Sequence, residues 1–229
     1  MLLIKIVLIM KNIKAIIFDA YGTLFDVNPA AEKCRDKIGD KWEGFANYWR
    51  TTQLEYTWLR SLMKRHKDFW QVTEDSLDKS MKAYEIDSSM RNELLDLYKI
   101  LLPFKEVPEV LKSLKEKDLK LAILSNGTPD LLEQLVKSNN LENIFDNIFS
   151  IEEVGIYKPN YKVYDIPIKE YQINKNEVAF LSSNTWDVSG GGNYGYNSIW
   201  VNRNQNIFDN LDYNPRYKIK NLLELLQLI

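Results

Sequence analysis

The chain has 229 residues, of which 45% are hydrophobic and 27% charged, a balance typical of a globular protein with one sizeable core. Thirty Lys and Arg residues face 32 Asp and Glu residues, for a net charge of −2, so no basic excess exists to neutralise nucleic-acid phosphates. We therefore expect no nucleic-acid partner. Cys34 is the single cysteine, which excludes an intramolecular disulfide and favours a reducing, cytoplasmic location.

The first ten residues, MLLIKIVLIM, are apolar. They are too few to span a bilayer, and they lack the basic segment and the small-residue cleavage site of a signal peptide. We predict no membrane partner. We interpret the segment as an extension of the first strand or as an upstream start, with Met10 as the alternative first residue.

The branched apolar run at residues 13–18 predicts a short buried strand. Residues 28–103 then carry a helical pattern without a convincing strand, and its last helix, at 90–102, ends before Pro103. Beyond this block, helices and strands alternate. Helices are predicted at 107–117, 129–138 (with Thr128 as N-cap), 161–171 and 219–228, and strands at 119–125, 148–151, 178–182 and 198–201.

This alternation predicts an α/β fold with a doubly wound, mainly parallel, Rossmann-like sheet. The helical block that follows the first strand is then an inserted helical cap subdomain. We predict a Rossmann-like catalytic core formed by residues 1–27 and 104–229, with the cap at residues 28–103.

Polar residues follow several predicted strands, and sheets of this kind bind ligands at the carboxyl ends of their strands. They are Asp19, Ser125 with Asn126, Lys158 in the loop before Pro159, and the segment 182–187. Each has a simpler interpretation, because Asp19 suits a turn, Lys158 a solvated surface and Asp187 the N-cap of a helix. Four such segments meeting at one crevice favour catalysis, with Asp19 as a carboxylate nucleophile.

Three further features of the sequence bear on a pocket, a metal site or a phosphate site. Arg50 shares a helical stripe with Leu54 and Trp58, so its guanidinium either reaches water or points into a capped pocket. His66, the only histidine, is interpreted as a solvated helix residue, so we expect neither a histidine metal site nor a Ser-His-Asp triad. The run 190–192 (Gly-Gly-Gly) lacks the lysine and the spacing of a phosphate loop and has no evident role.

Several segments together resemble a known enzyme family. DAYGTLFD (19–26), LKLAILSNG (119–127), the Lys158-Pro159 loop and Asp187 resemble the motifs of the haloacid dehalogenase superfamily. QLEYTWLRSLM (53–63), FKEVPEVL (104–111), YKPNYKVY (157–164) and SSNTWD (182–187) resemble, more narrowly, L-2-haloacid dehalogenases. The similarity runs from residue 13 to the C-terminus and implies a homodimer.

By this resemblance, Asp19 is the nucleophile. The matching catalytic positions are Thr23, Arg50, Ser125, Lys158, Tyr164, Ser182, Asn184 and Asp187, and the matching substrate- or halide-binding positions are Tyr21, Arg50, Leu54, Phe69, Asn126 and Trp186. The chain departs from the family pattern at Thr51, beside the arginine, and at the three glycines. These departures concern the shape and rigidity of the pocket more than its chemistry.

The absence of further acidic residues around Asp19 limits the types of reaction that the site could catalyse. Superfamily members that hydrolyse phosphate esters use a second aspartate two residues after the nucleophile, and acidic residues in the last motif to hold Mg²⁺. Tyr21 occupies the first position, and Ser182 to Asn184 leave only Asp187 at the second. A halide leaves without a proton. The resemblance therefore implies hydrolysis of short (S)-2-haloacids to (R)-2-hydroxy acids through an Asp19 ester, without metal or cofactor.

Two alternative functions remain at this point. A metal-dependent phosphatase or phosphonate hydrolase of the same superfamily would lose its activity in EDTA. A non-catalytic binding protein on the same scaffold would show no turnover, although Asp19, Lys158 and Asp187 are all present.

Overall fold

The computed structural model describes residues 9–27 and 35–229. The choice between Met1 and Met10 as first residue concerns residues 1–8, which lie outside this description. The first strand, β1, spans Ala15–Phe18, so residues 9–14 do not extend it as a strand, although the Met10 N–H donates to the Leu228 carbonyl at 2.7 Å. Among the described residues, no helix is both long enough and apolar enough to cross a membrane.

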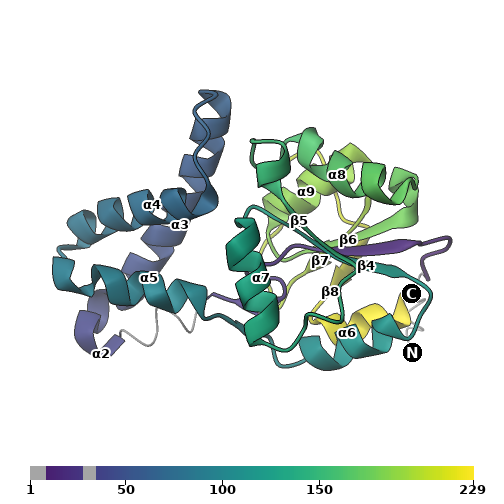
Figure 1. Ribbon diagram of the computed structural model, residues 1–229, viewed down its shortest axis with the longest axis horizontal. Helices are drawn as coiled ribbons and strands as arrows, with labels where there is room; N and C mark the ends of the chain where they lie inside the picture. The colour runs from purple at the N-terminus through teal and green to yellow at the C-terminus, as the bar shows by residue number, and fades with distance from the viewer. Residues whose placement is uncertain (1–8, 28–34) are drawn as a thin grey trace, which may run out of the picture.

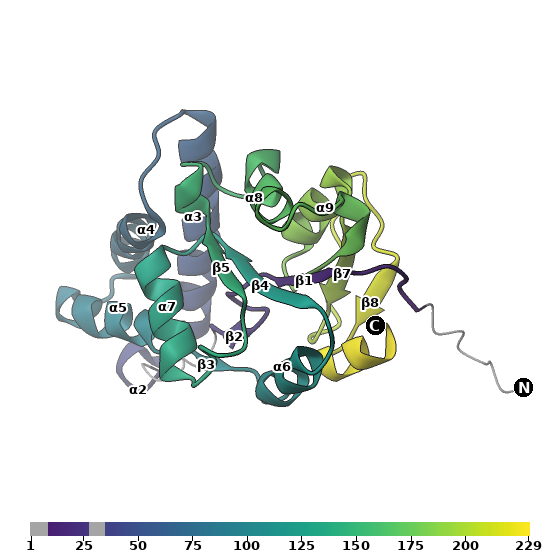
Figure 2. The same ribbon diagram turned by 45° about the vertical axis from the view of Figure 1, so that its right-hand side comes forward.

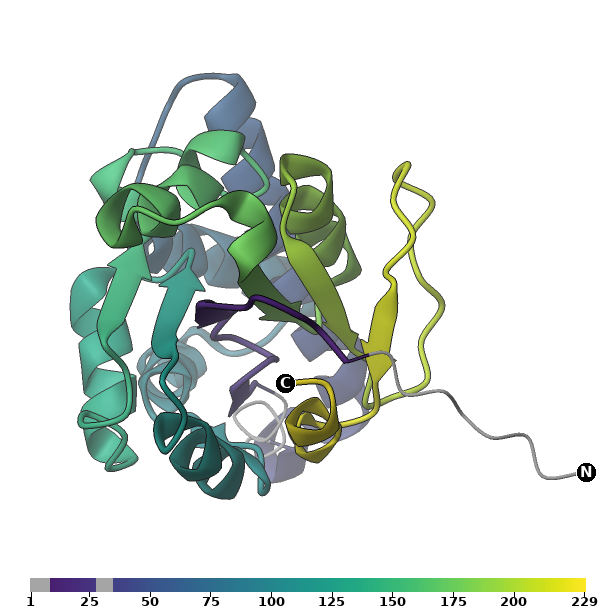
Figure 3. The same cartoon turned by 90° about the vertical axis from the view of Figure 1, so that its right-hand side faces the viewer.

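The core of the molecule is a six-stranded sheet in the order β5-β4-β1-β6-β7-β8, with every neighbouring pair parallel. Its remaining strands are β4 (Lys120–Ser125), β5 (Asn147–Ser150), β6 (Val178–Ser182), β7 (Asn197–Val201) and β8 (Tyr217–Ile219). Helices α6 (Val107–Lys115) and α7 (Pro129–Ser138) cover one face, and α8 (Tyr161–Tyr171) and α9 (Thr185–Tyr194) the other (Figures 1 and 3). The predicted doubly wound α/β fold is confirmed.

The strand sequences explain this layering. AIIF in β1 and VAFLS in β6 are buried along their whole length, as a strand covered on both faces must be. β8 was missed because it has only three residues and alternates buried and exposed side chains. The predicted closing helix at 219–228 is wrong. β8 ends at Ile219, and a 3-10 segment at Leu222–Gln227 packs beside α6 instead.

A helical layer stands beside the sheet (Figure 1). It contains α2 (Arg35–Ile38), α3 (Trp42–Leu62), α4 (Phe69–Tyr84) and α5 (Arg91–Lys99), with 3-10 turns at Gly39–Lys41 and Ser88–Met90. The chain leaves the core through β2 (Phe25–Asp26) and returns through β3 (Leu102–Pro103), which pair antiparallel. The predicted helix at 90–102 therefore ends too late, because α5 ends at Lys99 and Leu102 belongs to β3. The division into core and cap at residues 28 and 103 stays a prediction.

Two local predictions concern Thr128, which is confirmed at its position, and His66, which is wrong. Thr128 occupies the N-cap position of α7 in an extended conformation, but its side chain makes no capping hydrogen bond. His66 lies in the loop between α3 and α4, not in a helix, and its ring contacts the core. That contact could not be inferred from helical periodicity, because it joins residues far apart in the chain.

Candidate active site

The carboxyl ends of β1, β4 and β6 meet at one edge of the sheet, below the helical layer. Because the strands are parallel and in register, Asp19 follows β1 beside Ser125 at the end of β4 and Ser182 at the end of β6. A pocket opens there. Its lining comprises Asp19, Tyr21, Arg50, Leu54, Phe69, Ser125, Asn126, Asn184 and Trp186. The remaining predicted site residues, Thr23, Lys158, Tyr164, Ser182 and Asp187, form the hydrogen-bonded layer beneath it.

The Asp19 carboxylate is buried and held at both oxygens. Its Oδ2 accepts hydrogen bonds from the Thr23 hydroxyl at 3.1 Å, the Ser182 hydroxyl at 3.3 Å and the Asn184 amide at 2.9 Å. Its Oδ1 accepts one from Lys158 Nζ at 3.2 Å. These contacts fix the orientation of the carboxylate toward the pocket, which a nucleophile requires for in-line attack.

Lys158 is buried, which rules out the surface interpretation. Its Nζ lies 2.9 Å from Asp187 Oδ2 and 3.2 Å from Asp19 Oδ1, with a side-chain exposure of 0%. Burial alone lowers the pKa of an amine, but the charges of Asp187 and Asp19 outweigh it and raise the pKa of Lys158. The residue is therefore an ammonium ion between two carboxylates.

Asp187 is also fully buried, in the first turn of α9. It accepts hydrogen bonds from Lys158 and from the Tyr164 hydroxyl at 2.7 Å. Burial, opposed by Lys158 and assisted by Asp19, raises the pKa of Asp187 to about 6. Burial and the Asp187 charge raise the pKa of Tyr164 well above its ordinary value, so it remains a neutral donor. The simpler interpretation of Asp187 as the N-cap of α9 is excluded, because Asn184 occupies that position.

The turn after Asp19 is fixed by residues that the sequence did not single out. The Ser183 N–H donates to the Thr23 hydroxyl at 2.9 Å, and the Ser183 hydroxyl donates to the Gly22 carbonyl at 2.8 Å. Arg203 Nη2 donates to the Thr23 carbonyl at 3.0 Å and to Glu106 at 2.8 Å. The position of Arg203 just after a buried strand was the available signal. Its partners lie about a hundred or more residues away, so the contact itself was not inferable.

Arg50 closes the pocket from α3. Its Nη1 donates to Gln53 Oε1 at 2.7 Å, and Gln53 Nε2 donates to Thr73 at 2.6 Å, so the arginine is tied to α4. Of the two interpretations of Arg50, the capped pocket is confirmed. Leu54 lies on the same wall, while Trp58 is one turn further and contacts Trp186 edge-on, with ring centroids 5.5 Å apart.

The three glycines of α9 owe their presence to close packing. A Cβ on Gly190 would lie 2.5 Å from the Tyr164 hydroxyl, and one on Gly191 would lie 2.7 Å from the Phe180 ring. A Cβ on Gly192 would overlap the Tyr213 ring. Only glycine lets α9 approach this closely, so the run helps to place Tyr164 against Asp187.

The donors around Asp19 do not suit a hard divalent cation. Mg²⁺ requires several oxygen ligands, whereas the two facing carboxylates, Asp19 and Asp187, are bridged by the Lys158 ammonium. Within residues 9–27 and 35–229, no group of three or more His, Cys, Asp or Glu side chains is arranged to hold a metal ion.

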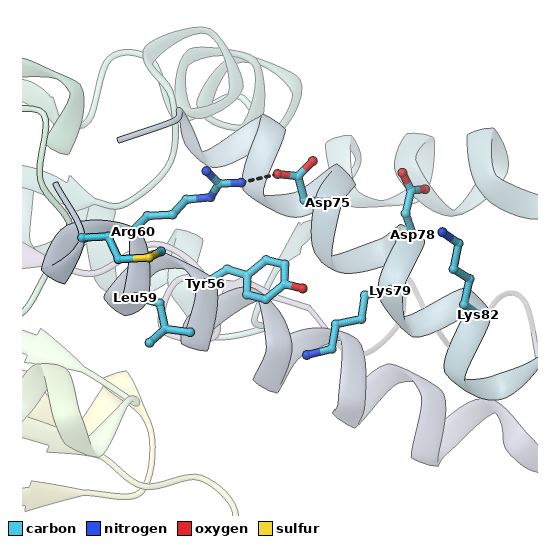
Figure 4. Close-up of a pocket in the computed structure, with 8 residues that line it drawn as sticks. Tyr56, Leu59, Arg60, Asp75, Asp78, Lys79 and Lys82 are labelled. Carbon is cyan, nitrogen blue, oxygen red and sulfur yellow. Dashed lines mark hydrogen bonds and ion pairs between the residues drawn. The ribbon is translucent and has the colours of Figure 1, made fainter. Parts of the chain in front are cut away.

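A wider groove lies elsewhere, between α3 and α4 (Figure 4). Its lining comprises Tyr56, Leu59, Arg60, Met63, Asp75, Asp78, Lys79 and Lys82. None of these residues lines the pocket around Asp19, and the Arg60–Asp75 ion pair at 2.5 Å occupies one end of it. The predicted site residues therefore gather at the smaller pocket and not at this groove.

Comparison with known proteins places this geometry in a family. The sequence profile of the haloacid dehalogenase-like hydrolases matches residues 13–195. The chain belongs to this family. This hydrolase is 38% identical to an (S)-2-haloacid dehalogenase from Pseudomonas sp. (strain YL), over 96% of the present chain and 95% of that protein. It is also 38% identical to an (S)-2-haloacid dehalogenase from Pseudomonas fluorescens, with 94% and 96% covered.

Solved structures agree with the sequence matches. The L-2-haloacid dehalogenase from Xanthobacter autotrophicus, with chloropropionic acid covalently bound, superposes on this hydrolase with a TM-score of 0.88. The two are 32% identical, and the match covers 94% of this chain and 98% of that chain. The family resemblance inferred from the motifs is confirmed.

Proposed function

We propose that this hydrolase is an (S)-2-haloacid dehalogenase that converts short (S)-2-haloacids to (R)-2-hydroxy acids through an ester on Asp19. One observation carries the proposal most. Asp19 faces the pocket with Lys158 as its buried cation, and Tyr21 stands where a leaving-group acid would be needed for an alkoxide. A halide requires no such acid.

Charge compensation is central to the first step. Two unit charges about 4 Å apart repel by roughly 4 kcal/mol at an effective dielectric constant near 20, so an anionic nucleophile resists an anionic substrate. Lys158 lowers that cost beside Asp19, and Arg50 supplies a second positive charge on the opposite wall. Both cations come from the chain itself.

In the first step, an oxygen of Asp19 forms a bond to C2 of the substrate while the carbon–halogen bond breaks and its electron pair leaves with the halide. Attack opposite the leaving group inverts C2. Arg50 and Asn126 are the residues we assign to the departing halide, since both line the pocket with hydrogen-bond donors. The apolar wall of Leu54, Phe69 and Trp186 excludes water from the reacting carbon.

In the second step, water attacks the carboxyl carbon of the Asp19 ester. Asp187, alone or through Lys158, takes a proton from the water as its oxygen bonds to the carboxyl carbon. When the tetrahedral intermediate collapses, the ester C–O bond breaks, and the departing alkoxide takes that proton from Asp187 to leave as the hydroxy acid. The other proton of the water is lost to solvent as the Asp19 carboxylate re-forms. The pKa of Asp187, about 6, suits a base that works near neutral pH. Water and haloacid thus give hydroxy acid, halide and a proton.

The decisive experiment measures halide release from each enantiomer of 2-chloropropionate in EDTA, with Asp19→Asn as the inactive control. We expect release from the (S) enantiomer only. A single turnover in ¹⁸O water should place label in Asp19 before it reaches the product. Release from neither enantiomer would reject the function, and label in product with none in Asp19 would reject the ester.

The proposal also covers the motion of the cap, the oligomeric state and the cellular location. The helical block at residues 28–103 acts as a cap that moves as a unit on the β2–β3 connection. Amide hydrogen exchange in variants with substitutions in that connection would test this motion. The protein forms a homodimer, for which the exposed apolar residues Leu59, Leu62 and Met63 on and just after α3 give support, and sedimentation gives the test. Its location is cytoplasmic, as the lone Cys34 suggests, and cell fractionation would check this.

A further inference from the structure

A compact group of contacts joins the far end of α3 to the core. We name it the tip cluster, and it consists of Ser61, His66, Lys67, Glu152 and Tyr157. The Tyr157 hydroxyl donates to the Lys67 carbonyl at 2.6 Å, and the Tyr157 N–H donates to the Ser61 hydroxyl at 3.2 Å. His66 Nε2 lies 2.9 Å from Glu152 Oε2, and the His66 ring lies 5.3 Å from the Tyr157 ring.

The tip cluster is connected to the active site through two segments of the chain. Tyr157 directly precedes Lys158, the ammonium that holds Asp19. Lys67 stands two residues before Phe69, which lines the pocket and packs on Tyr21 with ring centroids 5.3 Å apart. A single phenol hydroxyl therefore ties the loop of the catalytic lysine to the segment that leads into the pocket wall.

The pocket between these two segments is small. The space in it that the centre of a water molecule can reach is about 10 Å³, close to the least that one water needs. A 2-haloacid needs more space, so part of the lining moves when substrate binds, and Phe69 belongs to that lining. The β2–β3 connection lies at the other end of α3, and Figure 2 shows the tip of α3 beside the segment that follows β5. Contacts at the tip thus oppose widening of the pocket.

We propose that Tyr157, supported by the His66–Glu152 pair, is a positioning residue that sets the upper size limit of the substrate. This inference rests on the proposed dehalogenase function. A firm tip cluster keeps the wall close to Lys158 and admits a short side chain on C2. A weakened cluster lets the wall move outward, which favours longer side chains more than short ones.

The chemistry of the cluster fits a firm contact. Tyr157 is 1% exposed, and burial raises the pKa of its hydroxyl above the ordinary value, with Glu152 adding to the effect, so it stays a neutral donor. The His66–Glu152 pair is less strong because its side chains are 28% and 26% exposed. His66 Nδ1 and Glu152 Oε1 are buried without a hydrogen-bond partner among the described residues, so one contact holds the pair.

The test uses the ratio of kcat/KM for (S)-2-chlorobutyrate to that for (S)-2-chloropropionate. A loss of folded enzyme lowers the two kcat/KM values by the same factor. A merely structural effect therefore leaves their ratio unchanged. Tyr157→Phe should raise the ratio by about 2- to 10-fold, the range expected for one lost hydrogen bond. Glu152→Gln should raise it by about 1.5- to 5-fold, as for a partly exposed pair.

Two matched controls lie close by. Tyr171→Phe removes a hydroxyl that donates to Asn147, away from the pocket, and Glu153→Gln changes the exposed neighbour of Glu152. Both should leave the ratio at the wild-type value. An unchanged ratio in Tyr157→Phe, or an equal rise in Tyr171→Phe, would overturn the inference.

Amide hydrogen exchange provides a readout that does not need turnover. Tyr157→Phe should speed exchange in both segments that the cluster joins, residues 61–69 and 152–158, whereas Tyr171→Phe should not. If the wild-type enzyme releases no halide, the dehalogenase function fails, and the exchange result still decides whether Tyr157 couples the two segments. Unaltered exchange in either segment would overturn that coupling.

Discussion

Replacing Lys158 by Met tests the charge arrangement of the site most directly. The substitution removes a buried ammonium ion and keeps most of the side-chain volume. Nζ lies 3.2 Å from Asp19 Oδ1 and 2.9 Å from Asp187 Oδ2. By this geometry the two carboxylate oxygens stand at most about 6 Å apart, and in the variant they face each other with no cation between them.

The size of the effect follows from these distances. Lys158 lowers the pKa of Asp187 in the native protein, and the variant loses this attraction. Two opposite unit charges about 4 Å apart attract by roughly 4 kcal/mol at an effective dielectric constant near 20, which corresponds to about three pKa units. The pKa of Asp187, about 6 in the native protein, should therefore rise to about 9. Halide release at pH 7 should fall by about 10³-fold, because roughly 4 kcal/mol of repulsion between Asp19 and the substrate is no longer offset.

Two measurements check this reasoning. Carboxyl ¹³C NMR on protein labelled at aspartate follows the titration of Asp187, and an ion-selective electrode follows halide release. Lys162→Met, which removes an exposed lysine from α8, is the matched control and should change neither. The reasoning is refuted if Asp187 in Lys158→Met still titrates near 6, or if halide release stays within about tenfold of the wild-type rate.

Four further predictions concern the groups around Asp187 and Thr23. Halide release should fall as the pH drops through about 6, because Asp187 must be ionised to accept a proton, and a flat pH–rate profile would contradict this role. The pKa of Asp187 in the folded protein exceeds the ordinary 3.8, so ionisation of Asp187 opposes folding. The free energy of unfolding of the wild type, relative to that of Asp187→Asn, should therefore decline as the pH rises from about 4 to about 6, and urea unfolding measures it. Tyr164→Phe removes a hydrogen bond to the ionised carboxylate and should move the acid limb of activity upward by about one pH unit. Arg203→Lys keeps the charge but loses the fork that holds the Thr23 carbonyl, so kcat should fall by roughly 2- to 10-fold at constant KM, and a change in KM alone would contradict a positioning role.

Much of the site could be predicted because a parallel sheet converts chain order into spatial order. Polar residues that follow buried strands must meet at one edge, so Asp19, Ser125 and Ser182 were brought together by periodicity alone. Lys158 was placed in the same crevice by its loop and the following proline. The cap residue Arg50 was different. Helical spacing allowed either water or the pocket, and only the packing of α3 over the sheet decided between them.

The features that the sequence did not predict share one physical cause, because each depends on partner residues that are distant in the sequence. β2 and β3 are two-residue strands that pair with each other across the whole helical block, so neither carries a pattern of its own. His66 looks solvated by its charged neighbours, yet it meets Glu152 86 residues further along the chain. The glycines of α9 make sense only once Tyr164, Phe180 and Tyr213 are packed against them.

The sequence by itself determined the fold class, the place of Asp19 at the end of a strand and the absence of an acid two residues later, because these follow from local periodicity and from the residue types at strand ends. The tertiary structure alone decided the electrostatics. Lys158 and Asp187 gain their properties from complete burial within about 3 Å of each other, and burial changes the free energy of a charge by more than any local sequence preference. The pocket and the tip cluster around Tyr157 likewise exist only where the helical layer meets the sheet.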